Sequence, residues 1–315
     1  MIERNRIHRQ FLIGRMVSAA AMIAGLCLMI CTPSRTQELG AVLRSDMGLK
    51  SGTQPGPGYY FSFVYYDAEY SSVRGPNGNA LPGQVSTSLT LPFPVIAATT
   101  KWKLLGANYG FKVAIIFSNQ ALTSTLVPIS KSNTIGFGDI YIQPINLGWH
   151  KKRFEYLAAY AFHAPTGNGI RSLGFWTHEI IFGTTYYLDQ GKKWSVAGNG
   201  TLEIHQEKQN SDLLVGDFLT IKGGFGRTFL KGAASAGLVY SLQYKITHDG
   251  GTDLPKLLPN SLNRAYALGP EVSFPFFVKG KVAGFIGARY AWEFLNRSNF
   301  QGNNLALTMT IAKFD

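Results

Sequence analysis

Beyond residue 40, the sequence repeats long segments in which apolar residues occupy every second position. In VAGFIGARYAWEF, from Val282 to Phe294, the even positions are all apolar and end in aromatics, whereas the odd positions include Arg289 and Glu293. A period of two is typical of a β-strand with two different faces. The segment is much longer than the roughly five or six residues usual for strands in soluble proteins.

Twelve segments follow this pattern, and the connections between them alternate in length. Short connections are expected at 106–108, 150–152, 189–192, 230–232 and 278–280. Long ones, rich in Gly, Asn, Ser and Pro, are expected at about 70–92, 118–137, 164–173, 206–216, 246–262 and 295–302. The segments begin near Pro57, Phe93, Tyr109, Gly138, Arg153, Gly174, Lys193, Asp217, Lys231, Asn263, Lys281 and Asn303.

Their length and number favour a membrane protein over a secreted soluble β-protein, which is the alternative. Strands of about 10–14 residues are long enough to cross the hydrocarbon layer at a tilt, and aromatic residues near their ends suit the headgroup region. We therefore predict an all-β fold over residues 57–315: a transmembrane antiparallel β-barrel of about 12 strands in the bacterial outer membrane. Short turns would face the periplasm and long loops the outside.

The first residues have the pattern of a secretory signal. Four arginines lie within residues 1–15, and Met16 to Cys31 carries no charge. We expect a signal peptide over residues 1–36; an uncleaved anchor helix is the alternative. Both cysteines, Cys27 and Cys31, lie within it, so the mature chain would contain no thiol. Residues 37–56, rich in Gly and Pro, are too irregular for a strand and are expected to form a hatch inside the lumen.

Composition excludes several other classes. Charged residues make up only 15% of the chain, against about a quarter in soluble proteins. The net charge is +12, to which the signal contributes five arginines and one glutamate, and no nucleic-acid-binding signature accompanies it. We therefore expect no nucleic-acid partner.

Catalytic and metal-binding motifs are not evident. Gly223–Thr228 contains a G-x-G inside a predicted strand, where glycine relieves crowding. His163 could form part of a lipid hydrolase, but its nearest hydroxyl is Thr166, and a structural histidine at the base of a loop is the preferred interpretation. His163 and His205 share the lumen but lie on different strands, so we predict no metal, no cofactor and no enzyme activity.

The parity of the strands also predicts which polar residues face the lumen. They either satisfy one another as structural charges or surround a narrow solute path, and both interpretations stay open. Apolar residues such as Leu157, Val239 and Phe285 share this face. The candidates are Lys112, Glu155, His163, Glu179, Glu203, His205, Lys222, Glu271, Arg289 and Glu293.

Two charge clusters follow from the expected hairpin registers. Around the turn at 189–192, Glu179 and Glu203 become inward-facing neighbours, and we predict that Lys222 compensates them. Around the turn at 278–280, Arg289 faces position 269. We then expect Arg289 to be held by Glu271, its diagonal neighbour, by Glu293, or by both.

The chain resembles the MetA-pathway phenol-degradation family of outer-membrane transporter-like proteins, which are thought to be related to channels for long-chain fatty acids and aromatic hydrocarbons. The resemblance rests on strand and turn patterns over roughly residues 48–314, within Gly48–Tyr66, Gly138–Trp149, Ala158–Gly169, Leu268–Phe276 and Leu307–Phe314. It implies a role in the uptake of compounds for aromatic degradation. Residues 307, 309 and 311 have the opposite parity to Phe314, so a bulge near Ala312 or Lys313 would be needed for the terminal pattern that the barrel-insertion machinery recognises.

Together these observations predict an outer-membrane channel for passive uptake of small hydrophobic compounds, aromatic ones among them. Its partners would be that solute, outer-membrane lipid and the insertion machinery. The alternatives are a structural or adhesive barrel and an outer-membrane lipid hydrolase.

Overall fold

A computed structural model describes residues 40–314 apart from 84, 126–128, 231–233 and 255–260. The predicted signal and its two cysteines lie outside the described residues. Within this part of the chain, no helix is long and apolar enough to cross a membrane. The long strands are β1 (Gly58–Arg74), β2 (Val85–Leu104), β3 (Ala107–Ser124), β5 (Gly136–His150), β6 (Phe154–Ala164), β7 (Thr177–Tyr187), β8 (Trp194–His205), β10 (Phe218–Phe229), β11 (Ala234–Lys245), β13 (Arg264–Val278), β14 (Lys281–Arg297) and β15 (Asn299–Phe314).

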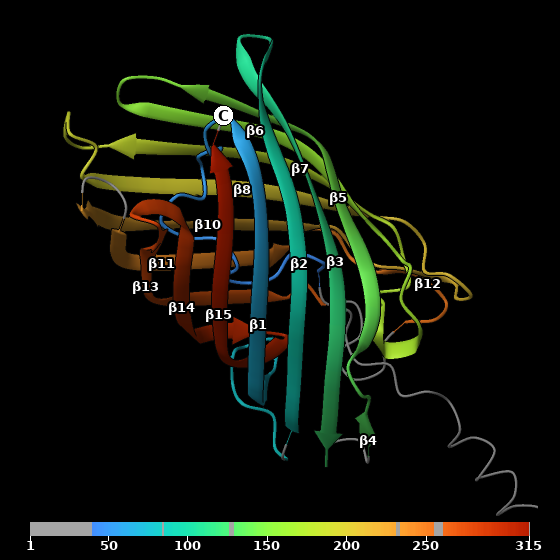
Figure 1. Ribbon diagram of the computed structural model, residues 1–315. Coiled ribbons are helices and arrows are strands. Elements are labelled where there is room, and N and C mark those ends of the chain that lie inside the picture. The colour runs from blue at the N-terminus through green and yellow to red at the C-terminus, as the bar shows by residue number, and fades with distance from the viewer. Residues whose placement is uncertain (1–39, 84, 126–128, 231–233, 255–260, 315) are drawn as a thin grey trace, which may run out of the picture. The chain divides into compact units, whose positions relative to one another are not determined.

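These twelve strands form one closed antiparallel barrel (Figure 1). Each pairs with its neighbours in chain order, and β1 pairs with both β2 and β15 to complete the ring. Closure leaves no long strand with an unpaired edge that lipid would have to solvate. The predicted fold class and strand number are therefore confirmed.

Three of the expected long loops are shorter than the sequence pattern indicated. The β1–β2 connection spans only 75–84, because β2 begins at Val85 rather than Phe93. Similarly, β3 continues to Ser124, and the short β4 (Ile129–Ser132) pairs with it. Strands β14 and β15 are separated by Ser298 alone. These strand ends are rich in Ser, Thr, Asn and Gln, and the start of β2 has its apolar residues, Val85, Leu89 and Leu91, only on the inner face, so the alternation did not distinguish them from loops.

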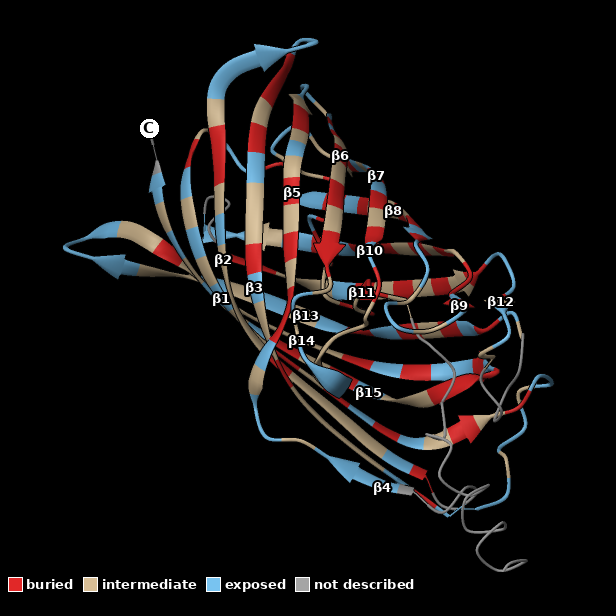
Figure 2. Ribbon diagram, turned by 90° about the vertical axis from the view of Figure 1, so that its right-hand side faces the viewer, coloured by how far each residue is buried: buried red, intermediate tan, exposed pale blue. Residues whose placement is uncertain are grey.

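The two faces of the wall differ as the alternation predicts, and buried and exposed bands succeed each other along the strands (Figure 2). Large apolar side chains are exposed on the outer face, among them Phe61, Phe182, Val196, Phe225 and Ile286. A soluble monomer rarely exposes so extensive an apolar surface, whereas hydrocarbon is a suitable solvent for it.

Small additional elements lie in the longer connections, at one end of the barrel. A 3₁₀ turn, η1 (Gly169–Arg171), follows β6, and β9 (Leu213–Leu214) pairs with β12 (Gly250–Gly251). At the other end, the pairing of β1 with β15 has no bulge near Ala312 or Lys313: the two strands pair without interruption from Gly58↔Phe314 to Tyr70↔Gly302. Position 314 is therefore on the same face of β15 as position 312 and on the opposite face from positions 307, 309 and 311.

Candidate functional site

Residues 40–57, which precede β1, contact the inner wall of the barrel (Figure 1). Ala41, Val42, Arg44, Leu49 and Gln54 are buried there. We call residues 40–54 the lumen segment. It carries almost no apolar periodicity and instead bonds to polar groups of many strands.

Near the start of the lumen segment, Glu203 on β8 accepts two backbone N–H groups. Its Oε2 lies 2.6 Å from the Ala41 nitrogen and 3.1 Å from that of Val42. Thr220 donates its hydroxyl to the other oxygen at 3.3 Å. A fully buried carboxylate needs such donors, so Glu203 fixes the position of the chain at Ala41 and Val42.

Arg44 forms an ion pair with Glu293 on β14. Nη1 of Arg44 lies 2.9 Å from Oε2 of Glu293, and both side chains are almost completely buried. Asn296 and Asn304 donate further hydrogen bonds to the same carboxylate. Removing either partner would leave a charge without compensation in a dry environment.

The predicted pairing of Arg289 with Glu271 is confirmed, with Nε to Oε2 at 2.8 Å. The two residues lie directly opposite rather than diagonally. The register differs from the expected one for two reasons. The turn consists of only Lys279 and Gly280, both with positive φ, and a β-bulge shifts the pairing between Phe276 and Phe277 on β13. Such two-residue turns match the twist of a hairpin. Glu293, the other predicted partner of Arg289, pairs with Arg44 instead. Glu271 also accepts the Leu49 N–H at 3.2 Å.

The predicted Glu179–Glu203–Lys222 cluster is only partly correct. Glu179 and Glu203 do face inward and lie directly opposite each other, one position from the expected register. Lys222, however, pairs with Asp46 of the lumen segment at 2.5 Å. The hairpin reasoning considered only barrel residues, so it omitted a carboxylate that enters from the N-terminal side.

Leu49 occupies a socket formed by glycines of the barrel wall. Its side chain is 2% exposed, and a Cβ added at Gly224, Gly226 or Gly237 would approach it to between 2.6 and 3.0 Å. The barrel wall has no side chains at these three glycines, so the Leu49 side chain packs directly on the backbone of the wall. The glycines of Gly223–Thr228 thus admit Leu49 rather than only relieving crowding within the strand.

A second polar group lies on β3, β5, β6 and β7. His163 Nε2 lies 2.9 Å from Glu179, and its ring packs edge-on against Tyr141 with centroids 4.9 Å apart. The Lys112 ammonium lies 5.0 Å from the same tyrosine ring. Among the described residues, no three His, Cys, Asp or Glu side chains converge as metal ligands do.

The remaining two candidates lie at opposite ends of the wall. Glu155, near the short turns, pairs with Lys192 at 2.8 Å and contacts His150. His205, near the long loops, bonds to the Thr177 hydroxyl at 2.9 Å. All ten predicted lumen residues therefore face inward, but in separate groups.

Apolar side chains occupy the inner wall between these groups. Tyr141, Leu157 and Ile181 form a buried cluster with alanines of β3 and β6, and a second cluster includes Tyr66 and Phe300. The lining is therefore mixed, as the sequence indicated.

Sequence reasoning missed the residues of the lumen segment itself. Arg44, Asp46 and Leu49 bond or pack to four different strands, β10, β11, β13 and β14, yet they follow no strand or helix period. The available signal was their composition, since two opposite charges and a leucine stand within six residues of one another.

A closed barrel with an apolar exterior and a polar, partly apolar interior defines a bacterial outer-membrane β-barrel protein. The family model described as "Putative MetA-pathway of phenol degradation" matches residues 71–309. The chain belongs to this family. A search among curated proteins finds no match.

Among solved structures, the COG4313 outer membrane channel from Pseudomonas putida F1 is similar, with a TM-score of 0.71 and 11% identity over 86% of this chain and 100% of that one. This likeness extends to the fold. A loop-deletion mutant of OmpT from Vibrio cholerae scores 0.36 with 9% identity, covering 84% and 100%. Acinetobacter baumannii OccAB4 scores 0.34 with 7% identity, covering 82% and 98%. The latter two scores are too low to support any argument.

Proposed function

We propose that the protein is an outer-membrane channel through which small hydrophobic compounds, aromatic ones among them, diffuse passively into the periplasm. The observation that carries this proposal is the mixed inner wall, where Tyr141, Leu157 and Ile181 lie beside charged groups. A purely polar pore would not retain an apolar solute, whereas a lining of this kind offers it contact area. The family and the barrel fold support the same function.

In this proposal, the lumen segment is a hatch. Its contacts with the wall are hydrogen bonds, ion pairs and the packing of Leu49, all of which can be exchanged without breaking a covalent bond. A solute would pass when the segment shifts along the wall. The inward-facing candidates then have two functions: some hold the segment, and His163, Glu179 and Lys112 border the path beside it.

Growth and uptake measurements test the proposal. A strain lacking the gene is compared with its parent, and with the same deletion strain carrying the restored gene, on a panel of aromatic and fatty carbon sources. Uptake of the labelled compounds is followed directly. We expect slower uptake at low solute concentration in the deletion strain, with sugars unaffected. Equal uptake of every compound in both strains would contradict the proposal.

The alternatives are distinguished by two variants. The channel model expects His163→Ala to retain uptake and the purified protein to show no lipid hydrolysis; activity that disappears with His163 would identify a hydrolase. Shortening the 75–84 connection should leave uptake intact. Loss of cell attachment in that variant, with unchanged uptake, would instead identify an adhesive barrel.

A further inference from the structure

Two arginines lie directly opposite each other where β13 begins and β14 ends, next to the longer connections. Arg264 and Arg297 are partners in the pairing of these strands, and both side chains are exposed. Their neighbours Ala265 and Asn296 are buried, so the two arginines lie on the outer face of the wall. Like charges directly opposite each other destabilise a pair of strands, and an anion between them would remove this effect.

Arg74, at the end of β1, lies at the same end and on the same face. Its neighbour Val73 packs in the buried cluster with Phe300 on the inner wall, so Arg74 points outward. β15 lies between β1 and β14, so two strand spacings, roughly 10 Å, separate Arg74 from the strand of Arg297 (Figure 1). The Nε atom of Arg74 is buried and has no hydrogen-bond partner among the described residues. We call Arg74, Arg264 and Arg297 the rim arginines.

No carboxylate within the described part of the chain forms an ion pair with a rim arginine. Glu271 and Glu293 lie on the same strands, but they face the lumen and are paired there. The two carboxylates therefore compensate charges inside the barrel and not those on its outer face.

The other carboxylates at this end either bond elsewhere or lie farther along the wall. Glu69 shares the outer face, but its partner Asn303 is four residues along β15 from Asn299, the partner of Arg74, which is roughly 13 Å. The engaged carboxylates are Asp217 with the His205 N–H, Asp249 with the Lys245 ammonium, and Asp253 with the Ser211 hydroxyl. The rim arginines are thus uncompensated at contact distance.

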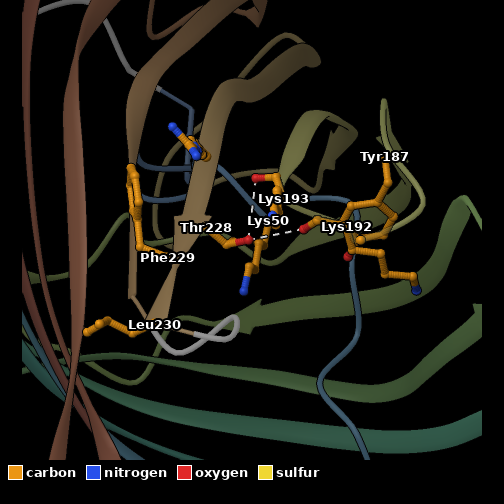
Figure 3. A pocket seen from close by; sticks show the side chains of 9 residues that line it. Lys50, Tyr187, Lys192, Lys193, Thr228, Phe229 and Leu230 are labelled. Atoms are coloured by element: carbon orange, nitrogen blue, oxygen red, sulfur yellow. Dashed lines mark hydrogen bonds between the residues drawn. The ribbon is translucent and has the colours of Figure 1, made fainter.

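Lysines at the opposite end of the barrel differ in this respect. Lys50 and Lys192 border a cavity there (Figure 3). Lys192 pairs with Glu155 at 2.8 Å, and Glu271 lies near Lys50. These cations have carboxylates of the chain beside them, whereas an anion in contact with the rim arginines has to come from outside the chain.

Aromatic and apolar side chains follow the rim arginines along the outer face. Tyr266 lies opposite Phe294, with ring centroids 6.4 Å apart, and Leu268 lies opposite Trp292. Phe294, Leu268 and Trp292 are exposed. On both strands the order from the end is therefore a cation, an aromatic ring and a further apolar side chain. This order matches the transition from headgroup phosphates to hydrocarbon at a membrane surface.

We infer that the rim arginines bind lipopolysaccharide, the phosphorylated glycolipid of the outer leaflet, on the outer face of β13, β14, β15 and β1. One phosphate would lie between Arg264 and Arg297, because guanidinium groups recognise phosphate with two parallel hydrogen bonds. Arg74 would reach a second anionic group of the same headgroup, and the acyl chains would cover Phe294 and Trp292. A phospholipid offers a single phosphate on a narrow headgroup, whereas the rim arginines extend across four strands. The inference rests on the predicted orientation, with the longer connections outside, and is independent of the solute.

The test is native mass spectrometry of the full mature protein in a nonionic detergent, with diphosphoryl lipid A as the probe. Lipid A without phosphates and phosphatidylglycerol are the comparison probes. We expect one diphosphoryl lipid A per barrel, bound at least about tenfold more tightly than either comparison lipid. Arg264→Gln and Arg297→Gln should each weaken this binding about fivefold, which is the contribution of one basic residue near a lipid surface.

The double variant Arg264→Gln/Arg297→Gln should lose the preference for phosphorylated lipid A. Arg227→Gln is the matched control, because Arg227 is also exposed on the outer face and lies 5.4 Å from the Trp194 ring, but at the opposite end of the barrel. It should bind lipid A as the parent does. Retention of the folded band on unheated gels checks each variant, and the single variants decide the matter if the double one fails to fold.

Three results would overturn the inference: equal binding of lipid A without phosphates, undiminished binding by both single variants, or an equal loss in Arg227→Gln. Tighter binding of phosphatidylglycerol than of diphosphoryl lipid A would also overturn it and make this face a phospholipid site. The rim arginines lie outside the lumen, so none of these results bears on the proposed function.

Discussion

Arg289 and Glu271 show how one charge pair depends on its partner inside the barrel. Arginine stays protonated at any accessible pH, so it cannot avoid burial by losing its charge. Glu271→Gln should therefore destabilise the barrel on the order of 3 kcal/mol, because it leaves Arg289 uncompensated. The double variant Glu271→Gln/Arg289→Gln should lose less.

The stability of both variants is measured as the temperature at which the band of the folded protein disappears from the gel. The Leu49 N–H loses a charged acceptor in each of them, so this effect is common to the single and the double change. An equal or larger loss in the double variant would exclude the pair as a source of stability.

Asp189 in the β7–β8 turn predicts a dependence on pH. The backbone N–H groups of Trp194 and Lys193 bond to its carboxylate and lower its pKa. Because the pKa is lower in the folded state, these bonds stabilise the turn above the ordinary aspartate pKa, and the contribution is lost as the pH falls through the lowered value. NMR titration of the carboxyl carbon measures that pKa directly.

Asp189→Ala should remove this part of the acid sensitivity while leaving the neutral-pH fold intact. Thermal melting of parent and variant between about pH 2 and 6 tests the sign. A titration at or above the usual aspartate range would contradict the assignment.

At the scale of elements, the lumen segment and the glycine socket act as one unit. Leu49→Ala removes a buried leucine that packs on Gly224, Gly226 and Gly237, which typically costs about 2–5 kcal/mol. That loss should fall on the attachment of the segment rather than on the hydrogen-bonded wall. We expect a higher mean conductance in planar bilayers with an unchanged melting temperature of the barrel.

Leu105→Ala is the matched control, because it makes the same change at a leucine that is 81% exposed in a turn. Gly226→Val should reproduce the Leu49 effect from the other side, since an added Cβ lies 2.6 Å from the Leu49 side chain. Unchanged conductance in both socket variants would mean that the segment is not held there.

The strands were predictable from sequence because the lipid and the lumen impose different side chains on alternate residues. The registers of the hairpins were less predictable from sequence, because they depend on details such as the two-residue turn at Lys279 and the bulge between Phe276 and Phe277. The partners of Glu203, Glu293 and Lys222 were not predictable, because the lumen segment has no periodicity that would place its residues.

For the whole molecule, the predicted topology places the short turns in the periplasm and the longer connections outside. Proteinase K added to intact cells should cut within the 75–84 connection and within 246–262. The turn at 150–152 should be cut only after the outer membrane is permeabilised. Cleavage at Lys151 or Lys152 in intact cells would reverse the orientation.

The position of the lumen segment has a consequence for assembly. Its residues come before every strand of the barrel, yet they bond to groups 162, 222 and 249 positions later in the chain. Contacts of such long range form slowly, since a large loop must close before any of them is gained. The seam between β1 and β15 joins the first and last strands. Glu203, Glu271 and Glu293 reach their places only as the wall forms, so the segment can attach fully only after the late strands that carry these residues have paired.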